Sequence, residues 1–170
     1  MTAAGSGLLE WRQLSFAELD AHTLYAVLQL RSEVFVVEQA CAFQDIDGAD
    51  HDAVHLLGSA DGALQAYARC LQPGAKFSEP SIGRVMTREA LRGTGAGHEL
   101  IERAVACVYL RWGSLPIRIG AQARLERYYR QHGFEAVGER YIEDGIPHIQ
   151  MLKPAPDGVP ECTREEHQKS

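Results

Sequence analysis

The stretch that decides the fold is SIGRVMTREALRGTGAGHELIERAVA, residues 81–106. It opens with a short apolar run at 81–87, which is typical of a strand. It then passes through Arg-Gly-Thr-Gly-Ala-Gly and continues with apolar residues at helical spacing from Leu100. Glycines let a ligand lie against bare backbone, and the first N–H groups of a helix attract an anion. The junction therefore predicts a binding site for a phosphate or pyrophosphate.

Two common phosphate motifs do not fit this junction. The Rossmann pattern G-x-G-x-x-G requires a glycine at position 98, where the chain has His98, and the P-loop sequence G-K-[ST] is absent. Dinucleotide binding and nucleotide hydrolysis are therefore disfavoured. The spacing that remains is Arg92-x-x-Gly95-x-Gly97. Taken alone, it fits a glycine turn that merely joins a strand to a helix equally well.

Hydrophobic periodicity places further elements on both sides of the junction. Ser15 and Glu18 form an S-x-x-E capping box that predicts the start of a helical region, one or two helices long, reaching residue 39. Asp61-Gly62 predicts a hairpin turn, and Gly133 a helix end. The predicted strands are 9–14, 54–58, 63–71, 81–87, 115–121, 134–142 and 146–152, with further helices at about 98–112 and 122–132. This order predicts an α/β or α+β layer with a mixed sheet.

Composition limits the class of protein. With 170 residues, the chain fits one domain, predicted over 1–153, followed by a flexible tail over 154–170 that contains three of the seven prolines. Neither a ~20-residue apolar span nor a signal peptide is present, so we expect a soluble, cytoplasmic protein that does not bind membranes. A net charge of −6 disfavours nucleic-acid binding. Four widely spaced cysteines indicate reduced thiols.

A second motif, AQARLERYYRQHGF at residues 121–134, gives the glycine loop a context. Together the two stretches resemble the two signatures of the GNAT superfamily of acyl-CoA-dependent N-acyltransferases, with Gln122, Tyr129, Gly133 and Phe134 at the matching positions. Most GNAT sequences carry Asn where Gln122 stands. The segments LRSEVFVVEQACAFQDIDGAD, IGRV, RGTGAG, AQARLERYY and EDGIPHIQM follow the same order as in the ElaA-like branch, over about residues 9–153.

The resemblance implies a GNAT fold, in which a mixed central β-sheet of about six or seven strands has helices on both faces. It implies transfer of an acetyl group from acetyl-CoA to a primary amine of a small molecule or peptide, by direct attack in a ternary complex. It also implies the cofactor-binding residues Val85, Met86, Thr87, Arg92, Gly93, Thr94, Gly95, Ala96, Gly97, Gln122 and Tyr129. Beside a glycine loop, Arg92 can add a charge-assisted bond to phosphate.

For the acid that protonates the leaving thiolate, the resemblance points to Tyr129. Its phenol is a weak acid with an ordinary pKa of ~10, and it can donate a proton within hydrogen-bond reach. Tyr128 lies about 100° further round a helix and cannot take the same position. The residues alone favour a packing role for Tyr129 against Phe134, and only the resemblance favours the acid role.

The amine side of the site is predicted from polar residues only. Glu38 is the candidate catalytic base, and the candidate substrate-binding residues are Glu38, His55, Glu143 and His148. Each has a plainer interpretation: an ion pair with Arg31 for Glu38, a buried core position for His55, and a structural role in a hairpin turn for Glu143 and His148. No metal is expected, because the acidic segment 43–53 does not match an EF-hand.

Two other functions stay open. LRSEVFVVEQ, residues 30–39, also weakly resembles the N-terminal helix of acyl-homoserine lactone synthases. A non-catalytic module that senses CoA is the second alternative. Whether the protein is a homodimer is also open, since no strand edge or patch in the sequence marks an interface.

Overall fold

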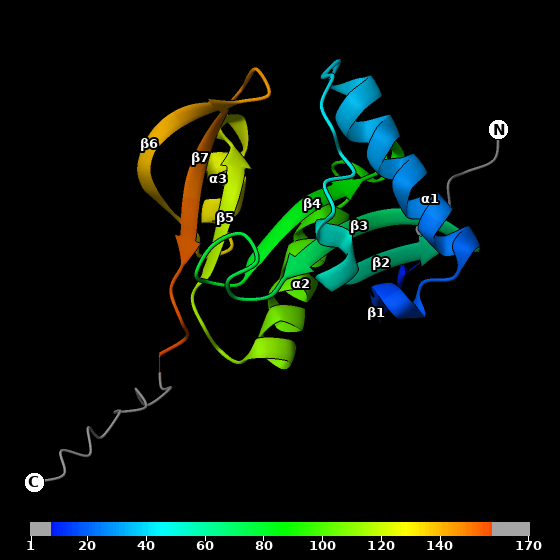
Figure 1. Cartoon of the computed structure of the whole chain (residues 1–170), viewed down its shortest axis with the longest axis horizontal. Helices are drawn as coiled ribbons and strands as arrows, with labels where there is room; N and C mark the ends of the chain where they lie inside the picture. The colour runs from blue at the N-terminus through cyan, green and yellow to red at the C-terminus, as the bar shows by residue number, and fades with distance from the viewer. Residues whose placement is uncertain (1–7, 158–170) are drawn as a thin grey trace, which may run out of the picture.

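The protein, described by a computed structural model over residues 8–157, is built around one seven-stranded sheet (Figure 1). The strand order is β1-β2-β3-β4-β5-β7-β6. The strands are β1 Glu10–Ser15, β2 Val54–Ala60, β3 Ala63–Leu71, β4 Ser81–Thr87, β5 Ile117–Gln122, β6 Glu135–Glu143 and β7 Ile146–Lys153. All neighbouring strands are antiparallel except β4 and β5, which are parallel. The predicted mixed sheet is thereby confirmed.

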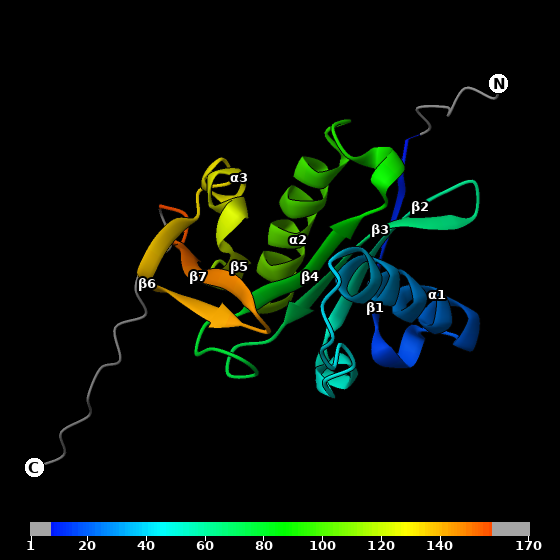
Figure 2. The ribbon, with the colours of Figure 1, turned by 90° about the horizontal axis from the view of Figure 1, so that it is seen from above.

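Helices cover both faces of the sheet, as the sequence predicts (Figure 2). The α-helices are α1 Ala21–Arg31, α2 Ala96–Trp112 and α3 Glu126–Arg130. The apolar face of α2, with Leu100 and Ala104, packs in a core with β2, β3, β4, β5 and β7. On the opposite face, α1 packs through Val27 and Leu30 against Tyr67 and Met86 in a second core. The central strands are therefore buried on both sides, as their continuous apolar runs indicate.

The sheet divides between β4 and β5. These two strands share a single ladder pair, Ser81 with Arg118, and then diverge (Figure 1). The backbone groups of residues 82–87 that face β5 have no strand partner there. Since buried N–H and C=O groups need partners, this gap is a place where a bound molecule can supply them.

A β-bulge bends β4 at the same point. Tyr67 pairs with Met86 and Arg69 with Gly83, so β4 advances three residues while β3 advances two. The extra residue is within 84–85, and Arg84 has a φ of +52°. Such a conformation is uncommon outside glycine and is found at functional sites. The bulge turns the β5-facing edge of β4 toward the gap.

The N-terminal helical region differs in detail from its prediction. The capping box of Ser15 and Glu18 forms, but it opens only a single 3₁₀ turn, Phe16–Glu18. The α-helix starts later, capped by Asp20, and continues as a π-helix, Ser32–Glu38. This second part contains a run rich in β-branched valines, which have low helix propensity. π-Helical turns are rare and frequently occur at functional sites.

The segment after β5 is also shorter than predicted. It forms a 3₁₀ turn, Ala123–Leu125, followed by the five residues of α3. At the end of this segment Gly133 has a φ of +83°, in agreement with its predicted role as a helix stop. The closing hairpin of β6 and β7 forms as predicted, with its turn at Asp144-Gly145.

At the far edge of the sheet, Gly58 makes room for Trp11. A Cβ atom at Gly58 would lie 2.8 Å from the Trp11 ring, whose Nε1 donates to Glu99 Oε1 of α2 at 3.0 Å. We expect Gly58→Ala to displace the ring and to lower the free energy of unfolding by about 1–3 kcal/mol, the usual cost of overpacking. Urea denaturation measures this, with Ser59→Ala as control. Equal unfolding midpoints for Gly58→Ala and the unchanged protein would contradict it.

Among residues 8–157, no helix is long and apolar enough to cross a membrane. In the predicted tail, residues 154–157 follow the end of β7 at Lys153, and residues 158–170 lie outside the described part of the chain.

Candidate functional site

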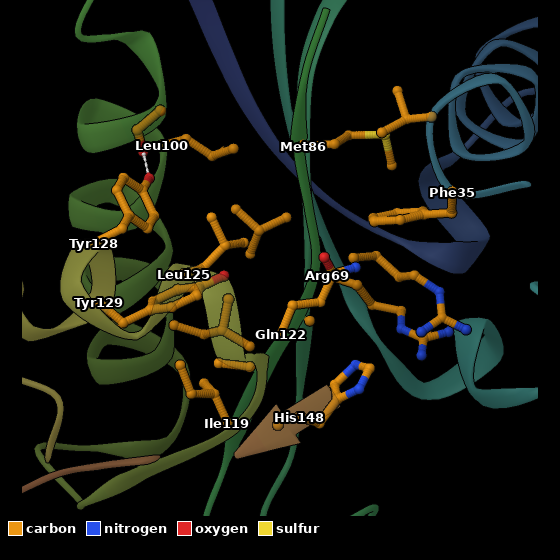
Figure 3. A pocket seen from close by; sticks show the side chains of 18 of the residues that line it. Phe35, Arg69, Met86, Leu100, Ile119, Gln122, Leu125, Tyr128, Tyr129 and His148 are labelled. Carbon is orange, nitrogen blue, oxygen red and sulfur yellow. Dashed lines mark hydrogen bonds between the residues drawn. The ribbon is translucent and has the colours of Figure 1, made fainter. Parts of the chain in front are cut away.

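A cavity of about 1100 Å³ occupies the gap between β4 and β5. In Figure 3, Leu100, Tyr128 and Tyr129 lie on one side of β4, while Phe35 and Arg69 lie on the other. The cavity therefore opens toward α2 and α3 on one side and toward the π-helix and the β6–β7 hairpin on the other. Many of the sequence-predicted residues line it, namely Glu38, Val85, Met86, Thr87, Arg92, Gly93, Gly95, Gly97, Gln122, Tyr129, Glu143 and His148.

The glycine loop forms the floor of the cavity at the start of α2. Gly93 and Gly95 have φ values of +79° and +89°, and no atom lies within 4 Å of where their Cβ atoms would be. Gly95 is the N-cap of α2, so the first N–H groups of this helix point out of the loop. The Ala96 N–H makes a long contact, 3.4 Å, to the Thr94 hydroxyl. The open space and the N–H groups of the first helical turn suit an anion such as a pyrophosphate. Thr94 and Ala96 do not line the cavity; the Thr94 hydroxyl instead donates to the Leu91 carbonyl at 2.6 Å.

Arg92 and Glu38 meet across the mouth of the cavity. Arg92 Nη2 donates to Glu38 Oε2 at 2.7 Å, and both side chains are nearly half exposed. The pairing of Glu38 with Arg31, considered from the sequence, is wrong, because Arg31 is fully buried and bound to Asp45 and Asp50. Glu38 is thus held beside the glycine loop, 54 residues away in sequence.

Tyr129 lies deep in the cavity wall. It is 8% exposed and packs edge-on against Phe134 and Tyr128, so it has the packing role considered from the sequence as well as a face on the cavity. Burial raises the pKa of its phenol well above the ordinary value. No protein group within residues 8–157 hydrogen-bonds its side chain. The phenol is therefore protonated at neutral pH and has a donor to offer.

Tyr128 takes a different position, as the helical geometry predicts. Its hydroxyl donates to the Gly97 carbonyl at 2.5 Å, and burial raises its pKa to about 12. Next to it, His98 Nδ1 and His132 Nε2 lie 2.8 Å apart and share a hydrogen bond. A Cβ atom on Gly97 would lie 3.2 Å from the Tyr128 oxygen, so the glycine allows α2 and α3 to approach closely.

Gln122 is the last residue of β5 and faces the π-helix. Its Nε2 donates to Gln39 Oε1 at 3.0 Å, and its own Oε1 accepts from Arg124. Both the oxygen and the nitrogen of the amide are thus engaged by protein groups. Together with the Arg92 pair, this bond connects the end of the π-helix to both walls of the gap.

The turn of the last hairpin supplies the acidic rim. Glu143 Oε2 lies 3.6 Å from His148 Nε2, while His148 Nδ1 lies 2.7 Å from the Ile146 carbonyl. The Asp144 carbonyl accepts from Cys41 Sγ at 3.3 Å, which ties the hairpin to the segment after the π-helix. Glu143 and His148 therefore order the hairpin, one of the two roles considered from the sequence, and they also line the cavity, so substrate binding stays a prediction for both.

His55 is not brought to the cavity. It is 1% exposed, its Nδ1 lies 2.7 Å from the Tyr67 hydroxyl, and its Nε2 lies 2.9 Å from the Asp50 carbonyl. Burial lowers its pKa, so it is neutral. The structure gives it the role of a buried histidine with both ring nitrogens satisfied.

The acidic segment 43–53 binds arginines. Asp45, Asp47 and Asp50 pair with Arg31, Arg69 and Arg84 at 2.6–3.4 Å. The hydrogen bond from Arg69 holds the pKa of Asp47 far below its usual range. Three carboxylates thus meet three guanidinium groups, and their charges balance. Across residues 8–157 no three His, Cys, Asp or Glu side chains are grouped to hold a metal ion.

Sequence reasoning missed several residues that line the cavity, chiefly Gln39, Lys76, Arg84, His98 and Tyr128. Gln39 directly follows the candidate Glu38, and Arg84 lies within the strand assigned to the cofactor, so their neighbourhood was a usable signal. Lys76 lies in an irregular loop, and nothing local marks it.

The sequence matches a known family model and is similar to known proteins. Residues 24–154 match the model of the family described as "Acetyltransferase (GNAT) domain". The chain is 45% identical over 148 residues to Protein ElaA of Escherichia coli strain K12, covering 86% of this chain and 97% of that protein.

Solved structures agree. An acyl-CoA N-acyltransferase from Pseudomonas aeruginosa superimposes with a TM-score of 0.81 at 47% identity, covering 85% of this chain and 99% of that one. The crystal structure of E. coli ElaA gives 0.81 at 44% identity, covering 86% and 99%. A CoA-dependent acyl-homoserine lactone synthase, crystallised with SAM and isopentyl-CoA, gives 0.65 at 14% identity over 85% and 83%, and shares the fold alone.

Proposed function

This chain belongs to the GNAT acetyltransferase family, in its ElaA-like branch, and on that premise we propose that it transfers an acetyl group from acetyl-CoA to a primary amine. The acceptor is an amine of a small molecule or peptide, and we propose that the reaction takes place in the cytoplasm. Fold and family support an acyl-CoA N-acyltransferase; the acetyl donor and the residue roles below are our proposal.

The observation that carries the proposal is the content of a single cavity. It brings together the open glycine loop, the unpaired edge of β4 and the hydroxyl of Tyr129. In this arrangement the pyrophosphate of acetyl-CoA lies on residues 92–97, and its pantetheine arm runs along residues 85–87 of β4. Free β4 N–H groups then hydrogen-bond the pantetheine and polarise the thioester carbonyl.

The chemistry requires three events at the thioester. The neutral amine nitrogen attacks the carbonyl carbon, the carbon–sulfur bond breaks, and the thiolate takes the proton of Tyr129. The excess proton of the amine passes to Glu38, directly or through water. Phosphate on the glycine loop competes with Glu38 for Arg92, so binding of acetyl-CoA frees the base that the amine needs.

The glycine loop gives a direct test. Gly95→Glu places a side chain where φ is +89° and adds a negative charge in the phosphate seat. We expect KM for acetyl-CoA to rise by about tenfold or more, the cost of one lost charge-assisted contact. Thiol release from acetyl-CoA with a panel of primary amines measures it.

Gly62→Glu is the matched control. Gly62 has a φ of +76°, also has open space around its Cβ position, and lies in the turn between β2 and β3, outside the cavity. It therefore also places a glutamate at a positive φ and adds the same charge. The glycine loop is not the pyrophosphate-binding site if both variants raise KM for acetyl-CoA equally, or if neither variant raises it.

The two alternatives predict different results in the same assay. A synthase-like enzyme would prefer an acyl group carried on acyl-carrier protein to acyl-CoA. A CoA-sensing module would bind CoA tightly and release no thiol with any amine.

A further inference from the structure

At the closed end of the gap, where β4 and β5 still pair, the cavity wall is unusually bare. Gly83 of β4 and Gly120 of β5 both line it, and no atom lies within 4 Å of a Cβ position at Gly83. At Gly120, the nearest atoms to that position are the Tyr141 hydroxyl at 3.0 Å and the Lys76 Nζ at 3.8 Å. Gly83 therefore leaves open space for a ligand group, and Gly120 lets an ammonium and a phenol approach β5 beside it.

The positive charge at this end comes from Lys76. The three arginines of the buried network, Arg31, Arg69 and Arg84, are matched by Asp45, Asp47 and Asp50, so that network is neutral. Lys76 adds one positive charge. Its ammonium lies over the Phe77 ring, 5.3 Å from the centroid, and within residues 8–157 no carboxylate lies within salt-bridge distance of it.

Arg69 leaves a further donor beside the same point. It pairs with Gly83 across β3 and β4, is 3% exposed, and has its two terminal nitrogens bound to Asp47 and Asp50. Its Nε has no partner among the described residues. An unsatisfied buried donor is costly, and an anion nearby would stabilise it.

The glycine-lined end of the gap lies close to the proposed reacting centre along β5. Gly120 lies two residues before Gln122, which corresponds to about 7 Å of strand. The proposed thioester position lies beside residues 85–87 and Gln122, and Glu38 lies beyond it, next to Arg92. The order along the gap is therefore a cationic end, the reacting centre and the candidate base.

On the basis of the proposed function, we propose that the acceptor is an amino acid whose carboxylate binds Lys76 at the glycine-lined end of the gap. A carboxylate one or two carbons from the amine, with one hydrogen bond of ~2.8 Å to the ammonium, places the reacting nitrogen about 6–7 Å from Lys76 Nζ, which is comparable to the strand spacing between Gly120 and Gln122. The single uncompensated charge of Lys76 suits a carboxylate better than a phosphate dianion. A polyamine acceptor would meet a like charge there.

The test compares each of alanine, leucine and phenylalanine with its own amide as acceptor. The amide lacks the negative charge, so kcat/KM for the acid divided by that for the amide isolates the carboxylate. Amine basicity differs between acid and amide, but this difference cancels when the ratio is compared between protein variants. We expect Lys76→Met to reduce the ratio by about tenfold and Lys76→Arg to retain most of it.

Two controls sharpen the result. Arg12→Met removes a positive charge from the exposed edge strand β1, away from the cavity, and is expected to leave the ratio as it is. The acceptor 6-aminohexanoate, whose amine and carboxylate are separated by five carbons, is too long for the proposed spacing. Its kcat/KM is expected to respond to Lys76→Met much less than that of alanine does.

The outcomes separate this inference from the function on which it rests. Thiol release with amines but an unchanged acid-to-amide ratio in Lys76→Met overturns the carboxylate site and leaves the acyltransferase in place. A preference for phosphoethanolamine or a diamine over every amino acid overturns it as well. No thiol release with any acceptor overturns the proposed function, and the carboxylate site with it.

Discussion

Replacing Tyr129 by Phe is expected to lower kcat for acetyl transfer by about 10²- to 10⁴-fold, the usual contribution of a positioned general acid. The ring stays in place because it packs against Phe134 and Tyr128, so the variant removes only the hydroxyl. That hydroxyl has no protein partner among the described residues, so its loss breaks no structural bond. Binding of acetyl-CoA, measured by calorimetry, is therefore expected to change little.

Tyr109→Phe is the matched control for this substitution. Tyr109 also carries a hydroxyl without a described partner, but it does not line the cavity. Its removal is expected to leave kcat as it was. If Tyr129→Phe retained kcat within about threefold of the unchanged protein, the acid role would be lost, since a proton donor contributes far more.

The raised pKa of Tyr129 adds a prediction about pH to the same experiment. Burial disfavours the phenolate, so the group keeps its proton above the ordinary pKa of ~10. The same apolar wall also disfavours a free thiolate, so proton transfer from Tyr129 to the thiolate becomes more favourable. We therefore expect that ionisation of Tyr129 causes no decrease in kcat between about pH 7 and pH 9. A decrease in the unchanged protein that Tyr129→Phe does not show would contradict this.

Replacing Arg31 by Met is expected to have the largest effect on stability. Arg31 is fully buried and binds Asp45 and Asp50, so its removal leaves each of these buried carboxylates with only one of its two arginine partners, Arg84 or Arg69. Breaking a buried pair in this way costs about 3–5 kcal/mol, a large share of the stability of a typical domain. Urea denaturation at pH 7 measures the difference. Arg31→Lys retains the charge but not the forked geometry of the guanidinium group. Its free energy of unfolding is expected to lie between those of Arg31→Met and the unchanged protein.

The matched control is Arg130→Met, since Arg130 is 53% exposed and pairs with Glu126 one helical turn away. Its loss is expected to cost at most about 1 kcal/mol, as for other exposed pairs. Similar unfolding free energies for the Arg31 and Arg130 variants would show that the buried network does not stabilise the fold.

The same network makes the free energy of unfolding depend on pH in acid. Burial alone would raise the pKa of Asp50, but its hydrogen bonds and the charges of Arg31 and Arg69 hold it below the ordinary value. For a carboxylate with a lowered folded pKa, the stabilisation is present above the unfolded value of ~3.9 and is lost as pH falls toward the folded value. The unchanged protein should therefore lose more unfolding free energy than Arg31→Met below about pH 4.

Local patterns in the sequence predicted the elements whose cause is local. The strand at 81–87 has the predicted bounds, and Gly93 and Gly95 have the positive φ values that their place before a helix requires. The hairpin of β2 and β3 turns at Asp61-Gly62, as its turn residues indicate. In each case, the deciding interactions join residues close together in the chain.

The other side of the site could not be predicted because its contacts join distant residues. Glu38 meets Arg92 over 54 positions and Gln39 meets Gln122 over 83, and no local pattern encodes such partners. The π-helix that ends at Glu38, just before Gln39, packs through Val34 into the core between α1 and β3, and such tertiary packing overrides the low helix propensity of its valines. The sequence also predicts that His55 binds the substrate, whereas its ring hydrogen-bonds Tyr67 and the Asp50 carbonyl; these partners are only 12 and 5 positions away, but no pattern in the sequence marks them.

The single ladder pair between β4 and β5 also bears on how the chain folds. Strands β1 to β4 pair only with one another, apart from that contact, and β5 to β7 form a second set. Within each set most partners are near in sequence, so the entropy lost on closing loops is modest and assembly is fast. We expect the two sets to form first and to dock afterwards. The last event of folding then creates the cavity itself, and slow docking would leave two ordered halves with no site between them.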